Sequence, residues 1–297
     1  MLDQVQINFD SHSLWILNIA LAFVMFGIAL SIDVQSFKPL LKKPKSIIIG
    51  VFSQFALLPA VTFLLVYLLN PDPAIALGMF LVAACPGGNI SNFITHYAHG
   101  NDALSVSLTA IATLLAVVMT PVNLSFWAGR YEPTAQMLKQ VSIAPFEMVQ
   151  LVALILGLPL ILGMSIHKKY PQKALRISKF FKKASLLFFI LLVFMALQKN
   201  FEAFQTYVMQ VFWLVLIHNV MAFLCGFSLG TFFKLPWKDV KTITIETGIQ
   251  NSGLGLLLIF TFFEGLGGMA ILAAFWGIWH LVSGLILGTF FNRITYK

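Results

Sequence analysis

Long apolar stretches recur along this chain, and they constrain its fold more than any other feature. A helix needs about 20 mostly apolar residues to cross the hydrocarbon core of a bilayer. Nine stretches approach or exceed this length: 14–32, 46–69, 74–99, 102–127, 146–166, 184–198, 208–232, 240–263 and 267–291. The sixth is short, and polar residues interrupt the third and the eighth. The sequence therefore predicts an all-α polytopic membrane protein with nine transmembrane helices.

Composition rules out a soluble domain of this size. Charged residues make up 10% of the 297 residues, hydrophobic residues make up 59%, and the mean hydropathy is +0.89. A soluble domain carries about 25% charged residues. The two cysteines, Cys85 and Cys225, fall in apolar stretches and give no disulfide or metal signal. We expect no cofactor, and residues 1–13 lack the Lys and Arg of a cleaved signal peptide.

The distribution of basic residues tests the helix count, because cytoplasmic loops of membrane proteins carry an excess of Lys and Arg. With the N-terminus outside and nine crossings, 16 of the 19 basic residues fall in inside segments. The inside residues are Lys38, Lys42, Lys43, Lys45, Lys168, Lys169, Lys173, Arg176, Lys179, Lys182, Lys183, Lys234, Lys238, Lys241, Arg293 and Lys297, and the outside ones are Arg130, Lys139 and Lys199. We predict an integral protein of the cell (inner or plasma) membrane with its C-terminus in the cytoplasm.

The net charge of +8 follows from this orientation and requires no nucleic acid as a partner. The densest basic run, residues 167–185, has a second interpretation besides an inside loop. It could form a surface helix that binds anionic membrane lipid.

Two apolar stretches contain helix-breaking sequences. The third contains "CPGGNISN" at 85–92, and the eighth contains "ETGIQNSGLG" at 246–255. Pro86 lacks a backbone donor, and the glycines of both segments weaken a helix. Glycine and proline also serve as packing surfaces in ordinary membrane helices. Two breaks near mid-membrane, each with Asn and Ser, favour unwound segments that are buried in protein or line a wet cavity.

The two interrupted stretches run in opposite directions under the predicted topology, and so do the stretches that follow them. Broken helices of opposite direction at corresponding places are typical of an inverted repeat, with substrate and ion sites where the breaks meet. A complete pair of repeats would have ten crossings. Nine crossings imply that one repeat lacks a helix, most simply its first.

Glu246 is the only charged residue between Lys241 and Glu264. A charged side chain at the centre of a membrane helix costs about 3 kcal/mol and usually marks function. No Lys or Arg lies in the interior of any apolar stretch, so the partner is a proton or a metal ion. The polar residues of the broken and neighbouring stretches offer oxygen ligands, namely Gln54, Ser91, Asn92, Ser105, Thr109 and Gln250 with the carbonyls of 247–249. One carboxylate among neutral oxygens favours sodium over calcium. Taken alone, Ser and Thr at positions such as 105 and 109 are more often packing residues between helices than ion ligands.

Four motifs, "SQFALLP" at 53–59, "CPGGNISN", "ALSVSLTAIAT" at 103–113 and "ETGIQNSGLG", resemble those of the bile acid:sodium symporters. The resemblance runs from the first apolar stretch to the ninth. It implies one transporter unit over 1–297, in which a core domain surrounds two crossed discontinuous helices and a panel domain stands beside it. The core would comprise about 46–127 and 208–291, and the panel about 14–32 and 146–198.

The resemblance also implies two sodium sites and a substrate cavity. The first sodium site would comprise Ser91, Asn92, Ser105, Thr109 and Glu246. The second would comprise Gln54, Glu246, Thr247, Ile249 and Gln250. A small organic anion would bind in the cavity at Gly88, Asn89, Asn251 and His280.

The expected function is secondary active symport of sodium with an organic anion by alternating access. The anion would be a bile acid, a steroid conjugate, pantoate or a 2-keto acid. One alternative is a proton-coupled or sodium-independent carrier of the same fold. Another is an intramembrane enzyme that uses Glu246 and His280 as acid and base, although no metal or nucleophile pattern supports it. We therefore expect a transporter and not an enzyme.

Overall fold

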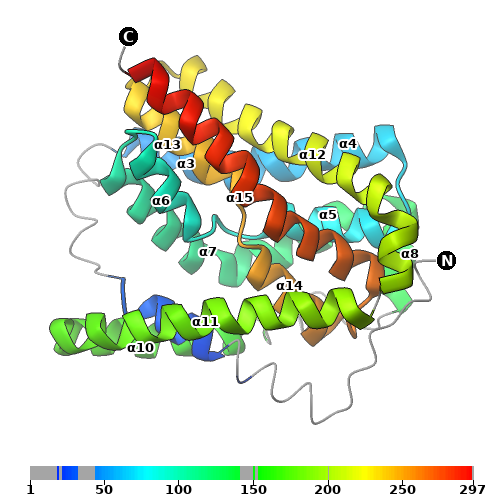
Figure 1. The fold of residues 1–297 in the computed structure, drawn as a ribbon, viewed down its shortest axis with the longest axis horizontal. Coiled ribbons are helices and arrows are strands. Elements are labelled where there is room, and N and C mark those ends of the chain that lie inside the picture. Colours follow the sequence, from blue (N-terminus) through cyan, green and yellow to red (C-terminus); the bar gives the residue numbers. More distant parts are fainter. Residues whose placement is uncertain are drawn as a thin grey trace.

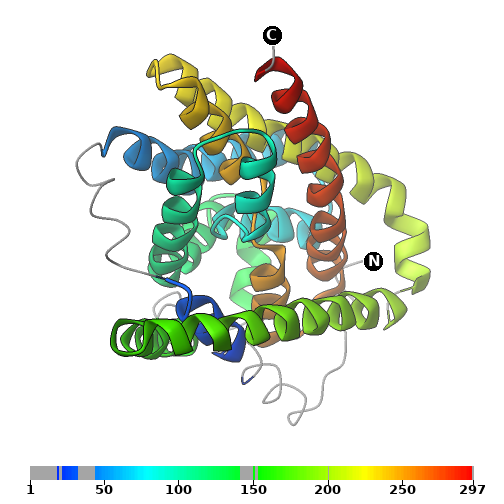
Figure 2. The same cartoon turned by 60° about the vertical axis from the view of Figure 1, so that its left-hand side comes forward.

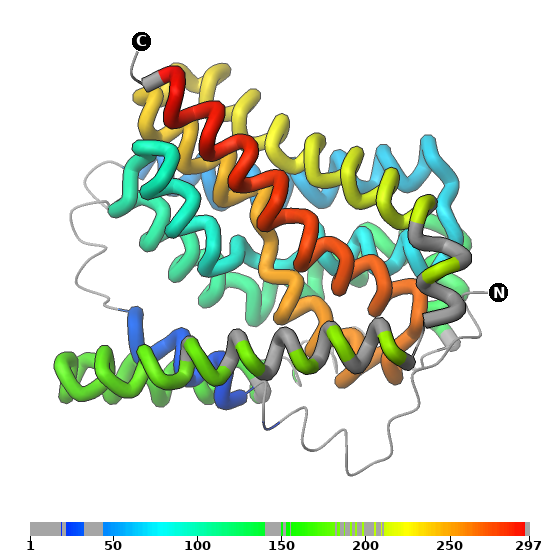
Figure 3. The backbone as a smooth tube through the Cα atoms, in the orientation of Figure 1, coloured from blue at the N-terminus to red at the C-terminus, as the bar shows by residue number. Residues whose placement is uncertain are grey.

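A computed structural model describes residues 19, 22–32, 44–140, 150, 153–199 and 201–295, and the described part is helical (Figure 1). Grey segments of the tube in Figure 3 mark the remaining residues, together with those, mostly in α11 and the start of α12, whose side chains are not described. Several sequence predictions lie there, namely those on residues 1–13, most of 14–21, Lys38, Lys42, Lys43, most of 146–152 and Lys297.

The described helices account for the predicted apolar stretches in order. Residues 22–29 are helical. The elements that follow are α3 (Lys45–Phe52), the π-helical η3 (Ser53–Leu57), α4 (Leu58–Leu69), α5 (Pro73–Ala84), α6 (Ile90–Tyr97), α7 (Asp102–Ala128), α8 (Glu132–Gln140), the π-helical η4 (Ala153–Gly157), α10 (Leu158–Lys169), α11 (Pro171–Lys199), α12 (Phe201–Phe232), α13 (Trp237–Gly248), α14 (Ser252–Phe262) and α15 (Gly267–Thr295).

Four described helices are long and apolar enough to cross a membrane: Lys45–Leu69, Asp102–Ala128, Val211–Phe232 and Gly267–Ile294. They correspond to the second, fourth, seventh and ninth predicted stretches. The third and the eighth are each divided into two shorter helices, α5 with α6 and α13 with α14. The predicted interruption of both stretches is therefore confirmed.

The basic run of 167–185 is helical and not an irregular loop, and a helix is also what its second interpretation, a surface helix, requires. It forms the end of α10 and the first half of α11, a continuous helix of 29 residues that includes the short sixth stretch. Pro171 starts α11, as proline does at a first helical position, and Lys, Arg, Ala and Leu are good helix formers. Charge pattern alone marks a segment as polar but does not distinguish a loop from a helix.

Lys241 also differs from its predicted place in an inside loop. It lies in α13 with its side chain buried, and its ammonium donates to the carbonyls of Ala98 (2.8 Å) and Phe291 (3.1 Å). The first carbonyl ends α6 and the second lies in the last turns of α15. A cation is favourable at helix C-termini, so Lys241 joins three helices.

Residues 22–32, α10 and α11 lie together along one side of the molecule (Figures 1 and 2). His167 of α10 hydrogen bonds to the carbonyl of Leu30 at 2.7 Å. A β-carbon at Gly163 would lie 2.5 Å from that of Ala29, so these two helices pack backbone to backbone. Phe181 of α11 covers Gly27 in the same group.

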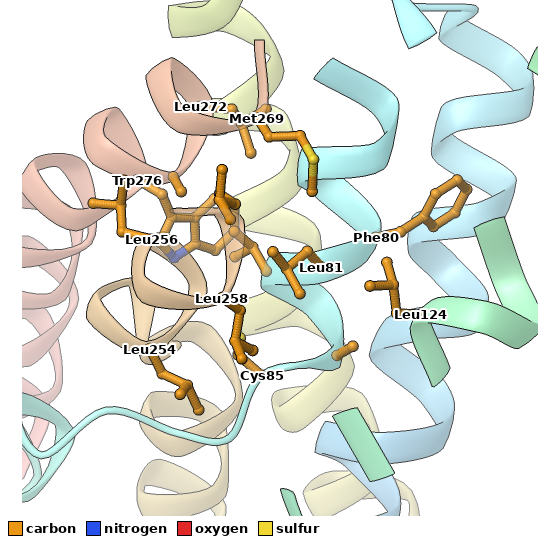
Figure 4. Packing of buried hydrophobic residues seen from close by; sticks show 14 of the residues in the cluster. Phe80, Leu81, Cys85, Leu124, Leu254, Leu256, Leu258, Met269, Leu272 and Trp276 are labelled. Carbon is orange, nitrogen blue, oxygen red and sulfur yellow. The ribbon is translucent and has the colours of Figure 1, made fainter. Parts of the chain in front are cut away.

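The hydrophobic core surrounds α5, which is buried on all sides from Ala74 to Ala84. Figure 4 shows Leu81 on the side of Leu258 and Trp276, which come from α14 and α15, and Phe80 on the other side near Leu124 of α7. A helix that is apolar all round belongs at the centre of a bundle. The segment between α5 and α6 therefore starts from a rigidly packed helix.

Close packing of α12 on α13 depends on Gly226 and Gly230, which lie four residues apart on one face of α12. A β-carbon at Gly230 would lie 3.2 Å from the Cα of Val240, and one at Gly226 would lie 2.6 Å from the carbonyl oxygen of Ile243. Such spacing of small residues lets two membrane helices approach closely.

We predict that Gly226→Ala lowers the thermal unfolding temperature in detergent, by the equivalent of about 1–3 kcal/mol, because the added methyl meets backbone that cannot rotate away. Gly157→Ala is the control, since its β-carbon would have only Val117 Cγ1, at 3.7 Å, as a neighbour. Equal unfolding temperatures in the two variants would contradict the close approach of α12 and α13.

Candidate functional site

The two unwound segments cross and hydrogen bond to each other. Gly87 and Gln250 form an antiparallel bridge. The amide of Gly88 donates to the carbonyl of Ile249, and the amide of Asn251 donates to the carbonyl of Pro86, both at 2.8 Å. Each unwound segment thus supplies hydrogen-bond partners for backbone groups of the other segment that are not bonded within a helix. This pairing lets irregular backbone exist inside the helical bundle.

Four helix ends meet at this crossing. The C-terminal ends of α5 and α13 precede the bridge, and the N-terminal ends of α6 and α14 follow it. Helix C-termini carry partial negative charge and N-termini carry partial positive charge. The crossing therefore offers carbonyl oxygens to a cation and backbone amides to an anion.

Glycine permits the close approach of the two segments. A β-carbon at Gly87 would lie 2.9 Å from Glu246 Oε2 and 3.2 Å from Gln54 Nε2. One at Gly88 would lie 3.1 Å from the carbonyl oxygen of Gln250. A side chain at either position would occupy the space beside the polar groups of the crossing.

The carboxylate of Glu246 is fully buried and accepts hydrogen bonds from three hydroxyls. Ser91 of α6 donates to Oε1 at 2.6 Å, and Ser105 of α7 reaches the same oxygen at 2.5 Å. Thr109, one turn further along α7, lies 3.0 Å from Oε2. The predicted i, i+4 spacing of Ser105 and Thr109 thus places both hydroxyls on the carboxylate.

Asn92 completes this cluster, because its Oδ1 lies 3.0 Å from the hydroxyl of Ser105 and 3.4 Å from that of Thr109. The structure therefore brings together all five residues assigned by resemblance to the first sodium site. Within the described residues, no Lys, Arg or His pairs with Glu246. A buried carboxylate without a basic partner is costly unless a cation or a proton neutralises it.

The second predicted site gathers around the end of α13. Gln54 lies in the π-helical turn η3, which precedes Pro59, and its Nε2 donates to the carbonyl of Glu246 at 3.2 Å. Such turns within α-helices are frequent at functional sites. Gln250 Nε2 donates to the carbonyl of Thr247 at 2.7 Å, and the carbonyl of Ile249 accepts from the bridge.

The side-chain oxygens of Gln54 and Gln250 are buried, with no hydrogen-bond partner among the described residues. Buried acceptors of this kind are rare and call for an explanation. Two of them beside the last carbonyls of a half-helix fit the oxygen ligands that sodium requires.

The predicted substrate residues divide into two groups. Gly88, Asn89 and Asn251 lie at the crossing, where Asn89 is exposed and Asn251 is half-buried at the start of α14. Asn251 Oδ1 caps α14 by accepting from the amide of Leu254 at 3.0 Å. His280 comes from α15, is 4% exposed, and has an Nδ1 without a partner among the described residues.

Sequence reasoning missed two buried residues of α12. His218 Nε2 lies 2.7 Å from the hydroxyl of Thr62 in α4, and Asn219 Nδ2 donates to the carbonyl of Gly248 at 2.7 Å. The signal was present, because these two polar residues stand together in the middle of the apolar stretch 208–232.

Crossed discontinuous helices over a buried oxygen cluster are typical of ion-coupled membrane transporters. Residues 18–207 match the model of the Sodium Bile acid symporter family. The chain belongs to this family.

Three relatives match between 80% and 98% of the chain. The chain is 32% identical to the uncharacterized sodium-dependent transporter YocS of Bacillus subtilis, covering 98% of this chain and 88% of that protein. It is 30% identical to the human ileal sodium/bile acid cotransporter, over 80% of this chain and 67% of that protein. It is 28% identical to the probable sodium/metabolite cotransporter BASS1, chloroplastic, of Arabidopsis thaliana, over 94% of this chain and 67% of that protein.

Family membership and these relatives make the chain a sodium-dependent membrane transporter and not an enzyme. Sodium is then a co-transported ligand, and no cofactor is indicated. The enzyme alternative, with Glu246 and His280 as acid and base, is excluded on the same ground.

We predict that Gly87→Ala weakens the stabilisation of the protein by sodium, because its methyl would enter the space between Glu246 and Gln54. The measurement is the rise in unfolding temperature between choline and sodium buffers. Gly255→Ala is the matched control, since its nearest neighbour would be Cys85 Sγ at an ordinary 3.7 Å. An unchanged sodium effect in Gly87→Ala would place the ion elsewhere.

Proposed function

We propose that the protein is a sodium symporter for a small organic anion and works by alternating access. The observation that carries this proposal is the fully buried carboxylate of Glu246, which stands among neutral oxygens at the crossing of two broken helices. A site with one negative charge suits a monovalent cation, whereas calcium favours several carboxylates.

The first sodium ion would bind between α6, α7 and α13. Its ligands would be the carboxylate of Glu246, the amide oxygen of Asn92 and the hydroxyls of Ser91, Ser105 and Thr109. Each of these hydroxyls can turn a lone pair toward a bound cation. The five oxygens come from three elements, so the ion would hold α6 against α7 and α13.

The second sodium ion would use the side-chain oxygens of Gln54 and Gln250. Glu246 would be shared between the sites, and the carbonyls of Thr247 and Ile249 would complete the shell. The unpartnered buried oxygens of both glutamines support this assignment. The negative end of the α13 dipole adds to the attraction.

The anion would bind where the N-termini of α6 and α14 meet, at Gly88, Asn89 and Asn251. Helix N-termini bind carboxylates, sulfates and phosphates through free amides. We assign the substrate to the class of bile acids, steroid conjugates, pantoate or 2-keto acids, which all carry such a group. His280 of α15 would supply a further polar contact to the substrate.

Alternating access requires two bodies that move past each other. We propose that residues 22–32, α10 and α11 belong to the panel and that the broken helices and their neighbours form the core. Side-chain hydrogen bonds join the core on one side, where Asp239 of α13 accepts from Ser46 of α3 (2.6 Å) and from Asn101 beside α7 (2.8 Å). Nine crossings, with the N-terminus outside and the C-terminus in the cytoplasm of the cell membrane, complete the arrangement.

The coupling energy is sufficient for accumulation. A tenfold sodium gradient supplies about 1.4 kcal/mol for each ion. Two sodium ions with one monoanion carry one net charge, which gains about 2.3 kcal/mol in a potential of about 100 mV. The total of about 5 kcal/mol would support roughly thousandfold accumulation.

We predict that Glu246→Gln abolishes sodium-driven uptake into proteoliposomes while the protein remains folded, because both sites lose their only charge. Glu132→Gln in α8, where the carboxylate is exposed, is the control and should transport normally. Wild-type uptake and sodium dependence in Glu246→Gln would refute the proposal. Uptake by the wild type without sodium at low pH would favour the proton-coupled alternative.

The topology makes a separate prediction. In intact cells, Gln136→Cys in α8 should react with an impermeant thiol reagent, whereas Lys173→Cys in α11 should be protected until the membrane is permeabilised. Both positions are exposed, and the native Cys85 and Cys225 are buried and give little background. The opposite labelling pattern would reverse the proposed orientation.

A further inference from the structure

Three successive carbonyls end α13, and each accepts a hydrogen bond from a different carboxamide. The last helical bond runs from the amide of Ile249 to the carbonyl of Ile245. Beyond it, Gln54 donates to the carbonyl of Glu246 at 3.2 Å, Gln250 to that of Thr247 at 2.7 Å, and Asn219 to that of Gly248 at 2.7 Å. The three amides come from η3, the broken segment and α12.

All three carboxamides share a second property. Their oxygens, Gln54 Oε1, Gln250 Oε1 and Asn219 Oδ1, are buried and lack a hydrogen-bond partner among the described residues. The three residues are 0%, 1% and 0% exposed. A buried unpaired acceptor costs about as much as a lost hydrogen bond, so three at one helix end would be unfavourable without a ligand.

The ligand that these oxygens fit is a cation. The end of α13 supplies three carbonyls at the negative pole of a helix, and the three amides add neutral oxygens around it. We propose that Asn219 is a third carboxamide of the second sodium site, with its oxygen acting beside those of Gln54 and Gln250. This inference rests on the proposed sodium symport and extends it to a residue outside the motifs that carry the family resemblance.

His218 supports the position of Asn219 from the adjacent place in α12. Thr62 donates its single hydroxyl proton to the carbonyl of Leu58 at 2.8 Å, so it accepts from His218 Nε2 at 2.7 Å. This bond fixes α12 against α4, and Trp276 packs edge to face on the imidazole at 4.7 Å between ring centroids. The contacts of α12 with α4 and α15 thereby hold Asn219 beside the end of α13.

The test is a sodium titration of thermal unfolding, with choline replacing sodium at constant ionic strength. Asn219→Leu keeps the branched shape and the number of side-chain heavy atoms, and it removes both the oxygen and the donor. The sodium concentration for half-maximal stabilisation should then rise about tenfold, as expected for the loss of one polar contact to an ion. Asn219→Asp keeps an oxygen and adds a negative charge, so it should need no more sodium than the wild type for half-maximal stabilisation.

The aspartate variant separates an ion ligand from a structural cap. A group that only caps the carbonyl of Gly248 needs its N–H, so Asn219→Asp would be at least as damaging as Asn219→Leu. Asn123→Leu in α7 is the matched control, because Asn123 is also buried with an unpartnered amide atom and accepts from Trp127 at 3.2 Å. Its sodium titration should equal that of the wild type.

Each outcome decides the matter. A wild type without any sodium effect overturns the proposed symport itself. A wild type that responds, with an Asn219→Leu variant that titrates identically, overturns only the role of Asn219. Equal loss in Asn219→Leu and Asn219→Asp also overturns it, in favour of a structural cap. If Asn219→Leu does not fold, Asn219→Asp alone decides, with retained sodium titration as the supporting result.

Discussion

The pairing of the two unwound segments is the interaction on which the rest of this structure depends. Peptide groups at membrane depth that lack partners cost several kcal/mol each. The bridge between Gly87 and Gln250 satisfies such groups from both segments with two backbone hydrogen bonds. It also fixes where α5 and α13 end and where α6 and α14 begin, because each of these boundaries lies within a few residues of the bridge. The position of Gly87 follows from this pairing, because a side chain there would meet Glu246 and Gln54 and push the two unwound segments apart.

One crossing can serve ligands of both signs because helix ends differ in polarity. The ends of α5 and α13 present carbonyls, and the starts of α6 and α14 present amides. The segment from Glu246 to Asn251 contributes to both, with a carboxylate at one end and a helix cap at the other. A cation that neutralises Glu246 and orders this segment would also prepare the cap for the anion. Sodium and substrate would therefore bind with positive coupling, and the coupling must be reciprocal.

Much of this arrangement could be predicted from sequence because its signals are local. Proline and glycine mark both breaks, and the spacing of Ser105 and Thr109 places two hydroxyls on one helix face whatever the fold. Asn219 was missed because its partner, the carbonyl of Gly248, lies 29 residues away and exists only after α13 has ended. Lys241 was misplaced for a related reason, since its carbonyl partners are 143 and 50 residues distant. Residue type and period identify a polar side chain, but they do not show which helix end it will meet.

A transporter must release what it binds, and the proposed sodium ligands fit that requirement. Conduction or transport fails when an ion is held too strongly to leave. A second carboxylate would raise the affinity for sodium, and it would also leave a larger buried charge when the ion departs. Hydroxyls and carboxamides avoid this cost, because they can rotate to hydrogen bond with the protein in the absence of an ion. Three hydroxyls lie within hydrogen-bond distance of the Glu246 carboxylate, and three amide groups donate to the last carbonyls of α13. If the proposed function holds, a single negative charge surrounded by rotatable neutral groups would let sodium leave the site as well as bind to it.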